Sequence, residues 1–553
     1  MSALPRRCAV LVVGAGPTGL SLAIRLRQLG VDCLLIDREP APMPWTRALG
    51  LQARTLEILD ALGVLDAVRQ RSRQLVAMHL HNQNGVLMEM DLTTLAATYP
   101  WVLSCPQPEV EQCLEEHYLA LGGHLCRNVT LDSFRQQGGE VRAVVTQGGS
   151  THEIAASLLV GCDGAHSRVR EQLGISFDGV EHPDRFLLAD VDIDWDYADN
   201  AAHVFMLPDG ALYALPLPHG WRLVLNLGAQ QGNGTDQDAP VSLAPFEERL
   251  ASIFEQPPTL SSAYWLNRFS IHRRLAGRYR VNRVLLAGDA CHVQSPVGAQ
   301  GMNTGIADAF NLAWKIGLFL DGVGGGRLLD SYETERRPVA RTMLTSMDLV
   351  SRASFTRNTL LRGARDSILK LAGRQPRFAA RFLRRLSQLD VSYTSSSIIG
   401  AGSGLFAALT DAGPEPGERM PDAALETAAD AQPLRVHTFL QEPSHRLFIQ
   451  LSSTLGHQEI VAAFALADRV PGAFSAWVRT AVVLPGDVPE TLRDLEEFDV
   501  NLLVDRDGEF ARCYGDQPAL WLMRPDGHLG YREHLSDGDQ LLLYLRNLFA
   551  RRD

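Results

Sequence analysis

The chain has 553 residues, a length that allows three or four domains of ordinary size. Hydrophobic residues make up 46% and charged residues 21%, which excludes a disordered chain and a fibre. The 52 basic residues against 64 acidic ones give a net charge of −12, which argues against nucleic-acid binding. No run of 18 apolar residues occurs, so we expect no membrane span. The eight cysteines form no CxxC pair and no Cys/His cluster at zinc spacing, so we expect reduced thiols, a cytoplasmic location and no metal site.

The first pattern along the chain predicts a nucleotide-binding unit. Ala9–Val13 reads as a buried strand, and the next residues are Gly14, Gly16 and Gly19 in the spacing GxGxxG. Residues 20–29 then carry apolar side chains at helical spacing, and residues 32–36 read as a second strand that ends before Asp37. In this context the glycines allow a tight turn and a close approach of backbone to a pyrophosphate. Asp37 would accept hydrogen bonds from a ribose.

A second group of motifs lies far from the first. An apolar strand ends at Gly288-Asp289, and a carboxylate at a strand end suits the hydroxyl groups of a ribityl chain. The glycine-rich segment 296–303 follows and opens a helix over residues 307–319. Its backbone N–H groups would suit the electron-rich edge of an isoalloxazine ring. Between the two groups, residues 158–170 read as another strand, turn and helix.

Five segments in this order resemble the class A FAD-dependent aromatic hydroxylases, the para-hydroxybenzoate hydroxylase-like flavoprotein monooxygenases. The segments are GAGPTGL (14–20), TRALGLQARTLEIL (46–59), GCDGAHSRVR (161–170), LLAGDACHVQSPVGAQGMNTGIADAFNLAWK (285–315) and LLDSYETERRPVA (328–340). The resemblance covers about residues 8–345. Residues 400–553 are similar to the thioredoxin-like appendage of larger members such as phenol hydroxylase and the polyketide hydroxylases.

The resemblance implies an α/β fold with a Rossmann-like FAD-binding domain, an inserted β-sheet substrate domain, a helical segment and a thioredoxin-like α/β domain. We expect the FAD-binding domain at 1–175 and 281–345, the substrate domain at 176–280, the helical region at 346–400 and the last domain at 401–553. Only Cys513 lies in that last domain, so we expect it to serve structure or dimer contact rather than redox chemistry.

The family's cofactor-binding positions carry over residue by residue. Those that match the FAD-contacting positions are Gly14, Gly16, Gly19, Asp37, Arg47, Gln107, Val129, Asp163, Arg168, Gly288, Asp289, Gly298, Gly301, Met302 and Asn303. The chain has a single valid fingerprint, so NADPH or NADH would bind transiently at the surface as reductant.

The implied reaction is hydroxylation of a phenolic or polyketide-type aromatic substrate with O₂ through a flavin C4a-hydroperoxide. The flavin carries this chemistry, and the protein supplies orientation and a dry pocket. No residue is fixed as catalytic. His292, Arg47 and Pro296 are candidates, and we interpret His292 first as a structural or FAD-adjacent residue. Epoxidation, Baeyer–Villiger-type oxygenation and oxidative decarboxylation are alternatives, and a non-catalytic flavin-binding interaction protein is a remote one.

The substrate pocket should lie on a sheet formed by residues 176–280. Segments 202–206, 211–216 and 221–226 read as its strands, separated by turns at 208–210 and 218–220. The candidate pocket residues are Trp101, Met206, Tyr213, Leu215 and Asn226. The sequence leaves the substrate, the choice of NADPH or NADH, and the oligomeric state open, with a homodimer as one expectation.

Overall fold

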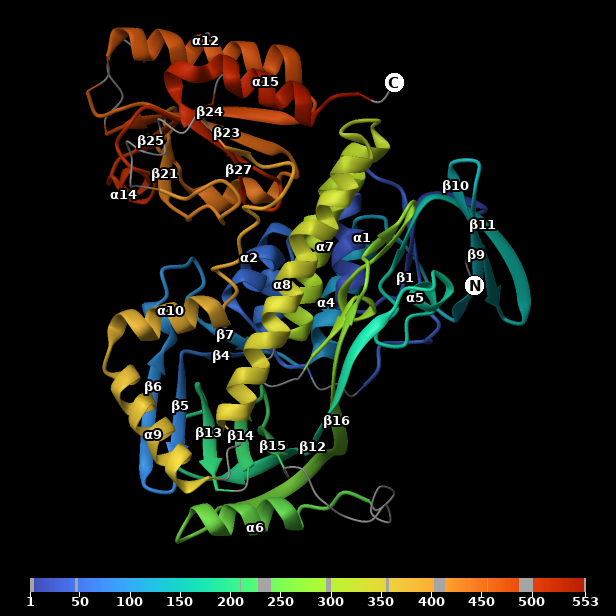
Figure 1. Cartoon of the computed structure of the whole chain (residues 1–553), viewed down its shortest axis with the longest axis vertical. Helices are drawn as coiled ribbons and strands as arrows, with labels where there is room; N and C mark the ends of the chain where they lie inside the picture. The colour runs from blue at the N-terminus through green and yellow to red at the C-terminus, as the bar shows by residue number, and fades with distance from the viewer. Residues whose placement is uncertain are drawn as a thin grey trace.

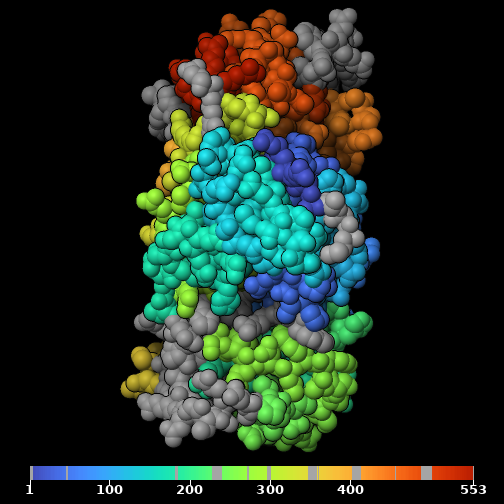
Figure 2. Space-filling model, turned by 90° about the vertical axis from the view of Figure 1, so that its right-hand side faces the viewer, coloured from blue at the N-terminus to red at the C-terminus, as the bar shows by residue number. Residues whose placement is uncertain are grey.

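Three parts of the molecule are stacked along its longest axis (Figures 1 and 2). The computed structural model describes residues 4–44, 48–208, 210–226, 240–294, 300–354, 358–401, 413–454, 456–486 and 501–551. The middle part holds the nucleotide-binding sheet, the lower part a second sheet, and the upper part the C-terminal domain. Each part is built on an eight-stranded sheet.

The middle sheet is mostly parallel and runs in the order β17-β18-β11-β1-β2-β8. Its strands are β1 (Arg7–Val13), β2 (Cys33–Ile36), β8 (His124–Cys126), β9 (Val129–Gln137), β10 (Glu140–Gln147), β11 (Ser150–Gly161), β17 (Arg280–Val281) and β18 (Val284–Leu286). The helices around it are α1 (Pro17–Gln28), α4 (Gln107–Ala120), α5 (Arg168–Gln172), α7 (Gly301–Leu320) and α8 (Gly325–Ser354). The predicted first strand, helix and second strand are confirmed. The apolar residues of these strands are buried because helices and loops cover both faces of a parallel sheet, so that neither face contacts solvent.

The second sheet has the order β19-β16-β12-β15-β14-β13-β5-β6. Its strands are β5 (Ala77–Asn82), β6 (Gly85–Asp91), β12 (Phe177–Asp194), β13 (Ala201–Leu207), β14 (Gly210–Pro216), β15 (Trp221–Asn226), β16 (Thr259–Ala276) and β19 (His292–Val293). The three strands predicted within 202–226 are confirmed. Strands β5 and β6 come from outside residues 176–280, so the sheet is wider than the sequence indicated.

Helices cover this second sheet on both sides. Helix α6 (Ala244–Ile253) packs Phe246 and Leu250 against one face. Helices α9 (Thr359–Gly373) and α10 (Pro376–Leu386) lie beside β6, where Leu383 packs with Met88 and Met90 (Figure 1). A small sheet of β3 (Gly50–Leu51), β7 (Val102–Ser104) and β4 (Arg73–Leu75), with α2 (Ala53–Ala61) and α3 (Leu65–Gln70), lies between the parts.

The C-terminal domain has a mixed sheet in the order β20-β27-β26-β23-β24-β25-β21-β22. Its strands are β20 (Gly400–Ala401), β21 (Ala424–Thr427), β22 (Pro433–Arg435), β23 (His445–Gln450), β24 (Val478–Pro485), β25 (Asn501–Asp505), β26 (Ala519–Met523) and β27 (Leu529–His534). The helices are α12 (His457–Phe474), α14 (Glu509–Tyr514) and α15 (Gly538–Leu548). A parallel β23–α12–β24 unit is followed by an antiparallel β26–β27 pair. The thioredoxin-like resemblance and the domain boundaries stay predictions.

Short 3₁₀ turns complete the chain at Leu92–Thr94, Gly288–Ala290, Val436–Gln441 and Leu535–Asp537. All eight cysteines are free thiols. Among the described helices, none carries an apolar stretch long enough to cross a bilayer.

A buried cluster of charges joins the C-terminal domain to the middle part. Glu335 of α8 accepts hydrogen bonds from Arg524 (2.8 and 2.9 Å) and from Lys315 of α7 (2.7 Å). Asp526 accepts from Arg524 and from Asn311 of α7 (2.9 Å). Burial alone would raise the pKa of Glu335, but Arg524 and Lys315 outweigh it and lower that pKa to about 2. The cluster therefore stays ionised and holds the two parts together.

Candidate functional site

The carboxyl ends of the parallel strands meet at one edge of the middle sheet, and the predicted cofactor residues gather there. Gly14 follows β1, Asp37 follows β2, Asp163 follows β11 and Gly288 follows β18. Ligands of open α/β sheets bind at this edge. The structure therefore brings together motifs that are up to about 270 residues apart in the sequence.

Glycine occupies the three positions of the first motif for different structural reasons. Gly14 has φ +105°, and a Cβ there would lie 2.3 Å from the Cys162 carbonyl oxygen. A Cβ on Gly19 would lie 1.9 Å from the Gly14 carbonyl oxygen, so α1 and β1 require glycine to pack. A Cβ on Gly16 would meet no described atom nearer than the Glu111 Oε1, at 3.9 Å. Protein packing therefore leaves the backbone at Gly16 accessible, as a pyrophosphate at the N-terminus of α1 requires.

Asp37 is held in place by backbone N–H groups. Its carboxylate accepts from the N–H of Ala15 (2.6 Å) and from the N–H of Glu39 (2.8 Å). The N–H of Val129 donates to the Asp37 carbonyl oxygen (2.9 Å), so Val129 lies next to Asp37; its predicted contact with the cofactor stays a prediction. Each carboxylate oxygen has two lone pairs, so Asp37 keeps capacity for a ribose hydroxyl.

The late Gly-Asp motif contacts the first motif directly. A Cβ on Gly288 would lie 2.5 Å from Oγ1 of Thr18, and a Cβ on Gly305 of α7 would lie 2.3 Å from the same atom. The start of α1, the turn at 288–290 and helix α7 therefore converge on Thr18. The Asp289 side chain is exposed to solvent, although the surrounding protein raises the pKa of its carboxyl by desolvation. Such a carboxylate is available to a bound ligand that would cover it.

Helix α4 adds a polar pair beside Gly16. Gln107 lies in its first turn and donates to Glu111 Oε1 (2.7 Å). Burial raises the pKa of Glu111 to about 7, and the charge of Asp37 adds to this effect. The sequence predicted Gln107 at the cofactor but did not indicate Glu111, whose spacing of four residues from Gln107 on a helix was the available signal.

Asp163 and Arg168 bracket the turn after β11. Asp163 Oδ2 accepts from the N–H of Val169 (3.1 Å), while its buried Oδ1 has no hydrogen-bond partner. Arg168 is exposed at the start of α5 and donates to the Leu131 carbonyl oxygen (3.4 Å). A buried carboxylate oxygen without a partner costs free energy unless a ligand or water supplies a donor.

The start of α7 is partly engaged in protein contacts. Asn303 is fully buried, accepts from the N–H of Gln52 (2.8 Å) and donates to the Gly50 carbonyl oxygen (2.8 Å). Met302 packs against the main core, and a Cβ on Gly301 would meet open space. Asn303 therefore anchors the helix start, which leaves Gly301 as the open position. The predicted residues Arg47, Pro296 and Gly298 lie outside the described residues.

His292 lies in a buried ionic group. Its Nε2 is 2.7 Å from Oδ2 of Asp308, whose Oδ1 accepts from Arg336 (2.6 Å). Only 2% of His292 is exposed. The Arg336 and His292 charges lower the pKa of Asp308 although burial would raise it. This geometry supports the structural interpretation of His292. Asp308 lies in the motif at residues 285–315 and Arg336 in the motif at residues 328–340. Their pairing could not be predicted, because it depends on contact between separate helices in the fold.

Four of the predicted pocket residues share one face of the second sheet. Val204 is paired with Tyr213 and Tyr213 with Val224, and period-two alternation then places Met206, Leu215 and Asn226 on the same side. The opposite face packs on α6. Tyr213 and Leu215 are half-buried, whereas Met206 and Asn226 are buried.

The same face carries a buried ion pair and further aromatic rings. Arg222 donates to both carboxylate oxygens of Asp190 (2.7 and 2.8 Å), and its guanidinium lies 5.3 Å from the Trp265 ring centroid. Phe186 and Phe269 stack at 5.3 Å. The sequence gives no local signal for this pair, because Asp190 and Arg222 meet only through the pairing of β12 with β15.

Trp101 lies elsewhere. Its ring is 5.9 Å from that of Tyr99, and the Arg69 guanidinium of α3 lies 5.8 Å from its centroid. The described contacts of Trp101 are thus with the middle part of the molecule rather than with the face that carries Tyr213.

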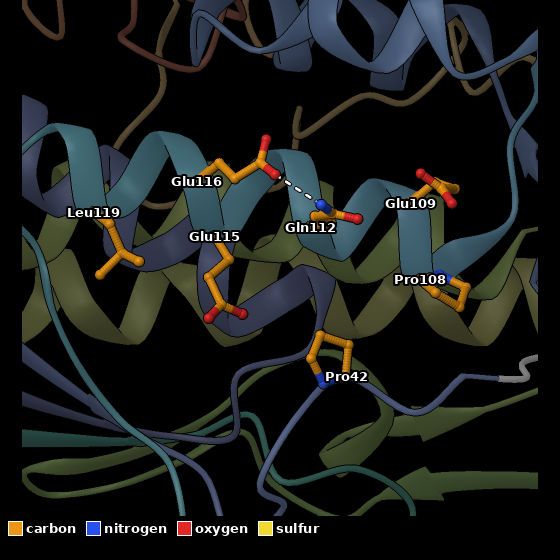
Figure 3. Close-up of a pocket in the computed structure, with 7 residues that line it drawn as sticks. All are labelled: Pro42, Pro108, Glu109, Gln112, Glu115, Glu116 and Leu119. Atoms are coloured by element: carbon orange, nitrogen blue, oxygen red, sulfur yellow. Dashed lines mark hydrogen bonds between the residues drawn. The ribbon is translucent and has the colours of Figure 1, made fainter. Parts of the chain in front are cut away.

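An open pocket lies along the outer side of α4 and includes Pro108 and Glu109, the residues that follow Gln107 (Figure 3). Its lining residues are Pro42, Pro108, Glu109, Gln112, Glu115, Glu116 and Leu119. Three carboxylates in so small a lining would repel a pyrophosphate. This pocket is therefore not the cofactor site.

Comparisons with known proteins identify the family of the chain. Residues 7–347 match the family model described as FAD binding domain. The chain is 30% identical over 549 residues to the 6-methylpretetramide 4-monooxygenase of Streptomyces rimosus, covering 98% of this chain and 93% of that protein. It is 29% identical over 555 residues to the pentachlorophenol 4-monooxygenase of Sphingobium chlorophenolicum, covering 98% and 97%. Among solved structures, the anhydrotetracycline hydroxylase of Streptomyces rimosus superposes with a TM-score of 0.75 at 27% identity, covering 99% and 100%.

Proposed function

Since the chain belongs to the FAD-dependent monooxygenases of aromatic compounds, we propose that its own substrate is a polycyclic phenol of the polyketide type. NADPH or NADH and O₂ are the co-substrates, and hydroxylation of the ring is the outcome. The observation that carries the proposal is the apolar face of the second sheet with Tyr213 and Leu215 half-buried on it. Relatives named for 6-methylpretetramide and anhydrotetracycline add support.

The size of that face favours a substrate with several rings. It extends from β13 across β14, β15 and β12 to β16, four strand spacings of about 4.8 Å each, or roughly 19 Å. Its side chains are aliphatic and aromatic apart from Arg222, Asp190 and a few amides. An apolar surface with a small number of polar groups suits an aromatic ligand, and the polar groups would orient its oxygen atoms.

The residues at the strand ends fit FAD. When bound, FAD supplies the redox chemistry, accepting a hydride from the nicotinamide and activating O₂. Gly16 and the start of α1 would receive the pyrophosphate, Asp37 a ribose and Asp289 the ribityl chain. The open Cβ position at Gly16 and the unpartnered Oδ1 of Asp163 are the observations that support this fit.

A cytoplasmic location belongs to the same proposal. The reductants NADPH and NADH are cytoplasmic, and eight free thiols suit a reducing compartment. We also propose a homodimer in which the C-terminal domain provides contacts between the two subunits.

The test is a substrate screen with product analysis. Purified FAD-loaded protein is supplied with NADPH or NADH and with single-ring phenols, naphthoates and polycyclic quinols under ¹⁸O₂. We expect polycyclic phenols to stimulate NAD(P)H oxidation most and to gain one ¹⁸O atom as a new hydroxyl group. Stimulation by single-ring phenols alone would overturn the proposed substrate class. An epoxide product would indicate epoxidation in place of hydroxylation. A ring-expanded ester would indicate Baeyer–Villiger-type oxygenation, and a decarboxylated product would indicate oxidative decarboxylation.

A further inference from the structure

Three histidines lie together on the second sheet, on the face opposite Tyr213. His79 and His81 are two residues apart on β5, so their side chains point to the same side. His203 lies on β13, which pairs with β5 in parallel, with His203 opposite His79 and Phe205 opposite His81. Residues 122 positions apart in the sequence thus form one cluster.

The nitrogen atoms of the three histidine rings lie close to one another. His81 Nε2 and His203 Nδ1 are 3.1 Å apart, and one atom from each of the three rings lies within 4.8 Å of the others. A tetrahedral zinc ion with Zn–N distances of about 2.0 Å requires ligand atoms roughly 3.3 Å apart. Without a metal, the same two nitrogens share a proton in a hydrogen bond.

The surroundings of the cluster are aromatic. His81 stacks on Phe205 at 4.7 Å, and the Tyr197 ring lies 4.3 Å from His203. Only 5% of His81 and 1% of His203 are exposed, while His79 is half-buried and gives access from solvent.

We propose that His79, His81 and His203 bind one divalent transition-metal ion of the zinc type. Imidazole nitrogen is a preferred ligand of Zn²⁺, Ni²⁺ and Cu²⁺, and a three-histidine site leaves a position for water. The role we infer is structural, because the site faces away from the sheet surface that carries Tyr213 and Leu215. The ion would join β5, which comes from residues 77–82, to β13, which comes from residues 201–207. Sequence spacing predicted no metal site, since the third ligand is remote in the chain.

The test measures metal content directly. Tag-free, FAD-loaded full-length protein is stripped with chelator, dialysed against ZnCl₂ and analysed by atomic absorption. We expect about one Zn²⁺ per chain in the wild type and in His152→Ala, whose histidine is exposed on β11. We expect His79→Ala and the double variant His79→Ala/His81→Gln to weaken binding by tenfold or more. A second readout is the electron paramagnetic resonance spectrum of bound Cu²⁺, which should show nitrogen ligands that His79→Ala reduces in number.

The outcomes separate the possibilities. The half-buried position of His79 makes its alanine variant the one most easily folded, and its FAD content and circular dichroism verify the fold. Zinc content unchanged in His79→Ala would overturn the proposal. No zinc retained by the wild type at micromolar free metal would overturn it too, and would leave the His81–His203 hydrogen bond as the function of the cluster.

Discussion

Two regions differ in whether the protein itself pairs their polar groups: the interface between the middle part and the C-terminal domain, and the strand ends of the middle sheet. Where α7 and α8 meet the C-terminal domain, the charges of Glu335, Lys315, Arg524 and Asp526 are paired with one another and closed to solvent. At the strand ends, the Asp289 carboxylate is exposed and Asp163 Oδ1 is buried without a partner. A polar group that the protein satisfies contributes to the fold, whereas one that it leaves unsatisfied is available to a ligand. Substitutions in the first region should therefore change unfolding, and substitutions in the second should change FAD affinity.

The largest effect should come from alanine substitutions at Gly19 and Gly16, two glycines that differ in how much space the protein leaves for a Cβ atom. Gly19→Ala places a methyl group 1.9 Å from a backbone oxygen, so we expect little or no folded protein. Gly16→Ala has 3.9 Å of room, so we expect a folded apoprotein whose FAD affinity falls about tenfold because the methyl group occupies space needed by the pyrophosphate. Circular dichroism and FAD fluorescence titration measure the two quantities. Equal behaviour of the two variants would break the distinction between packing and ligand glycines.

The second-largest effect should come from removing one charge from the buried interface between the middle part and the C-terminal domain. Arg524→Ala leaves Glu335 and Asp526 without their main cation, and breaking a buried pair in this way costs about 3–5 kcal/mol. We expect a much lower thermal unfolding midpoint and, in the protein that remains folded, an unchanged FAD dissociation constant. Arg546→Ala, an exposed arginine on α15, serves as the control and should unfold like the wild type. A weakened FAD affinity with normal unfolding would contradict the comparison.

The converse result is expected for Asp289. Asp289→Ala removes a carboxylate that would accept a hydrogen bond from the ribityl chain, worth about 1.5–3 kcal/mol or roughly ten- to a hundredfold in the FAD dissociation constant. The unfolding of the apoprotein should not change, because the side chain is exposed. Cys291→Ala, two residues away in the core, is the matched control and should keep its FAD affinity. Similar losses in both variants would remove Asp289 from the ribityl site.

The smallest effect should be a pH dependence at Glu111. In the unfolded chain this carboxyl ionises near pH 4.5, but in the fold its pKa is about 7. Between these values the folded state holds a proton that the unfolded state has lost, so stability falls as the pH rises through the interval. Above pH 7 the ionised carboxylate beside Gly16 would also repel the pyrophosphate. We expect the FAD dissociation constant to rise severalfold from pH 6 to pH 8 in the wild type and to stay flat in Glu111→Gln.

The control for Glu111 lies on the same helix. Glu116 is exposed, and Glu116→Gln should retain the pH dependence of the wild type. A flat profile in the wild type, or the same slope in Glu111→Gln, would assign the titration to another group.

The nucleotide-binding edge could be predicted because it depends on local rules. Gly14 and Gly19 are required by backbone geometry, and the alternation of Tyr213 and Leu215 along β14 follows from the pleat of a strand. The glycine spacing and the strand–helix–strand context are both visible over about 30 residues. Residues 45–47 and 295–299 lie outside the described structure, so Arg47, Pro296 and Gly298 stay predictions.

The features that could not be predicted all depend on contacts between distant segments. The pairing of β5 with β13 widens the second sheet and assembles the histidine cluster, yet nothing in residues 77–82 indicates which strand they join. The Asp190–Arg222 pair and the Glu335–Arg524 contact, 189 residues apart, likewise need the folded topology. Charged residues in a sequence suggest a solvated surface, and only packing shows that these are buried.

The interface also has a consequence for the order in which the chain folds during synthesis. Glu335 leaves the ribosome 189 residues before Arg524, which at 5–20 residues per second is a delay of roughly 10 to 40 s. Through that interval the end of α7 has no covering domain. Lys315 and Glu335, however, already neutralise each other, and Arg524 and Asp526 later emerge as a second neutral pair. Each side can therefore form by itself without exposing an uncompensated charge, and docking joins two neutral pairs rather than two opposite charges.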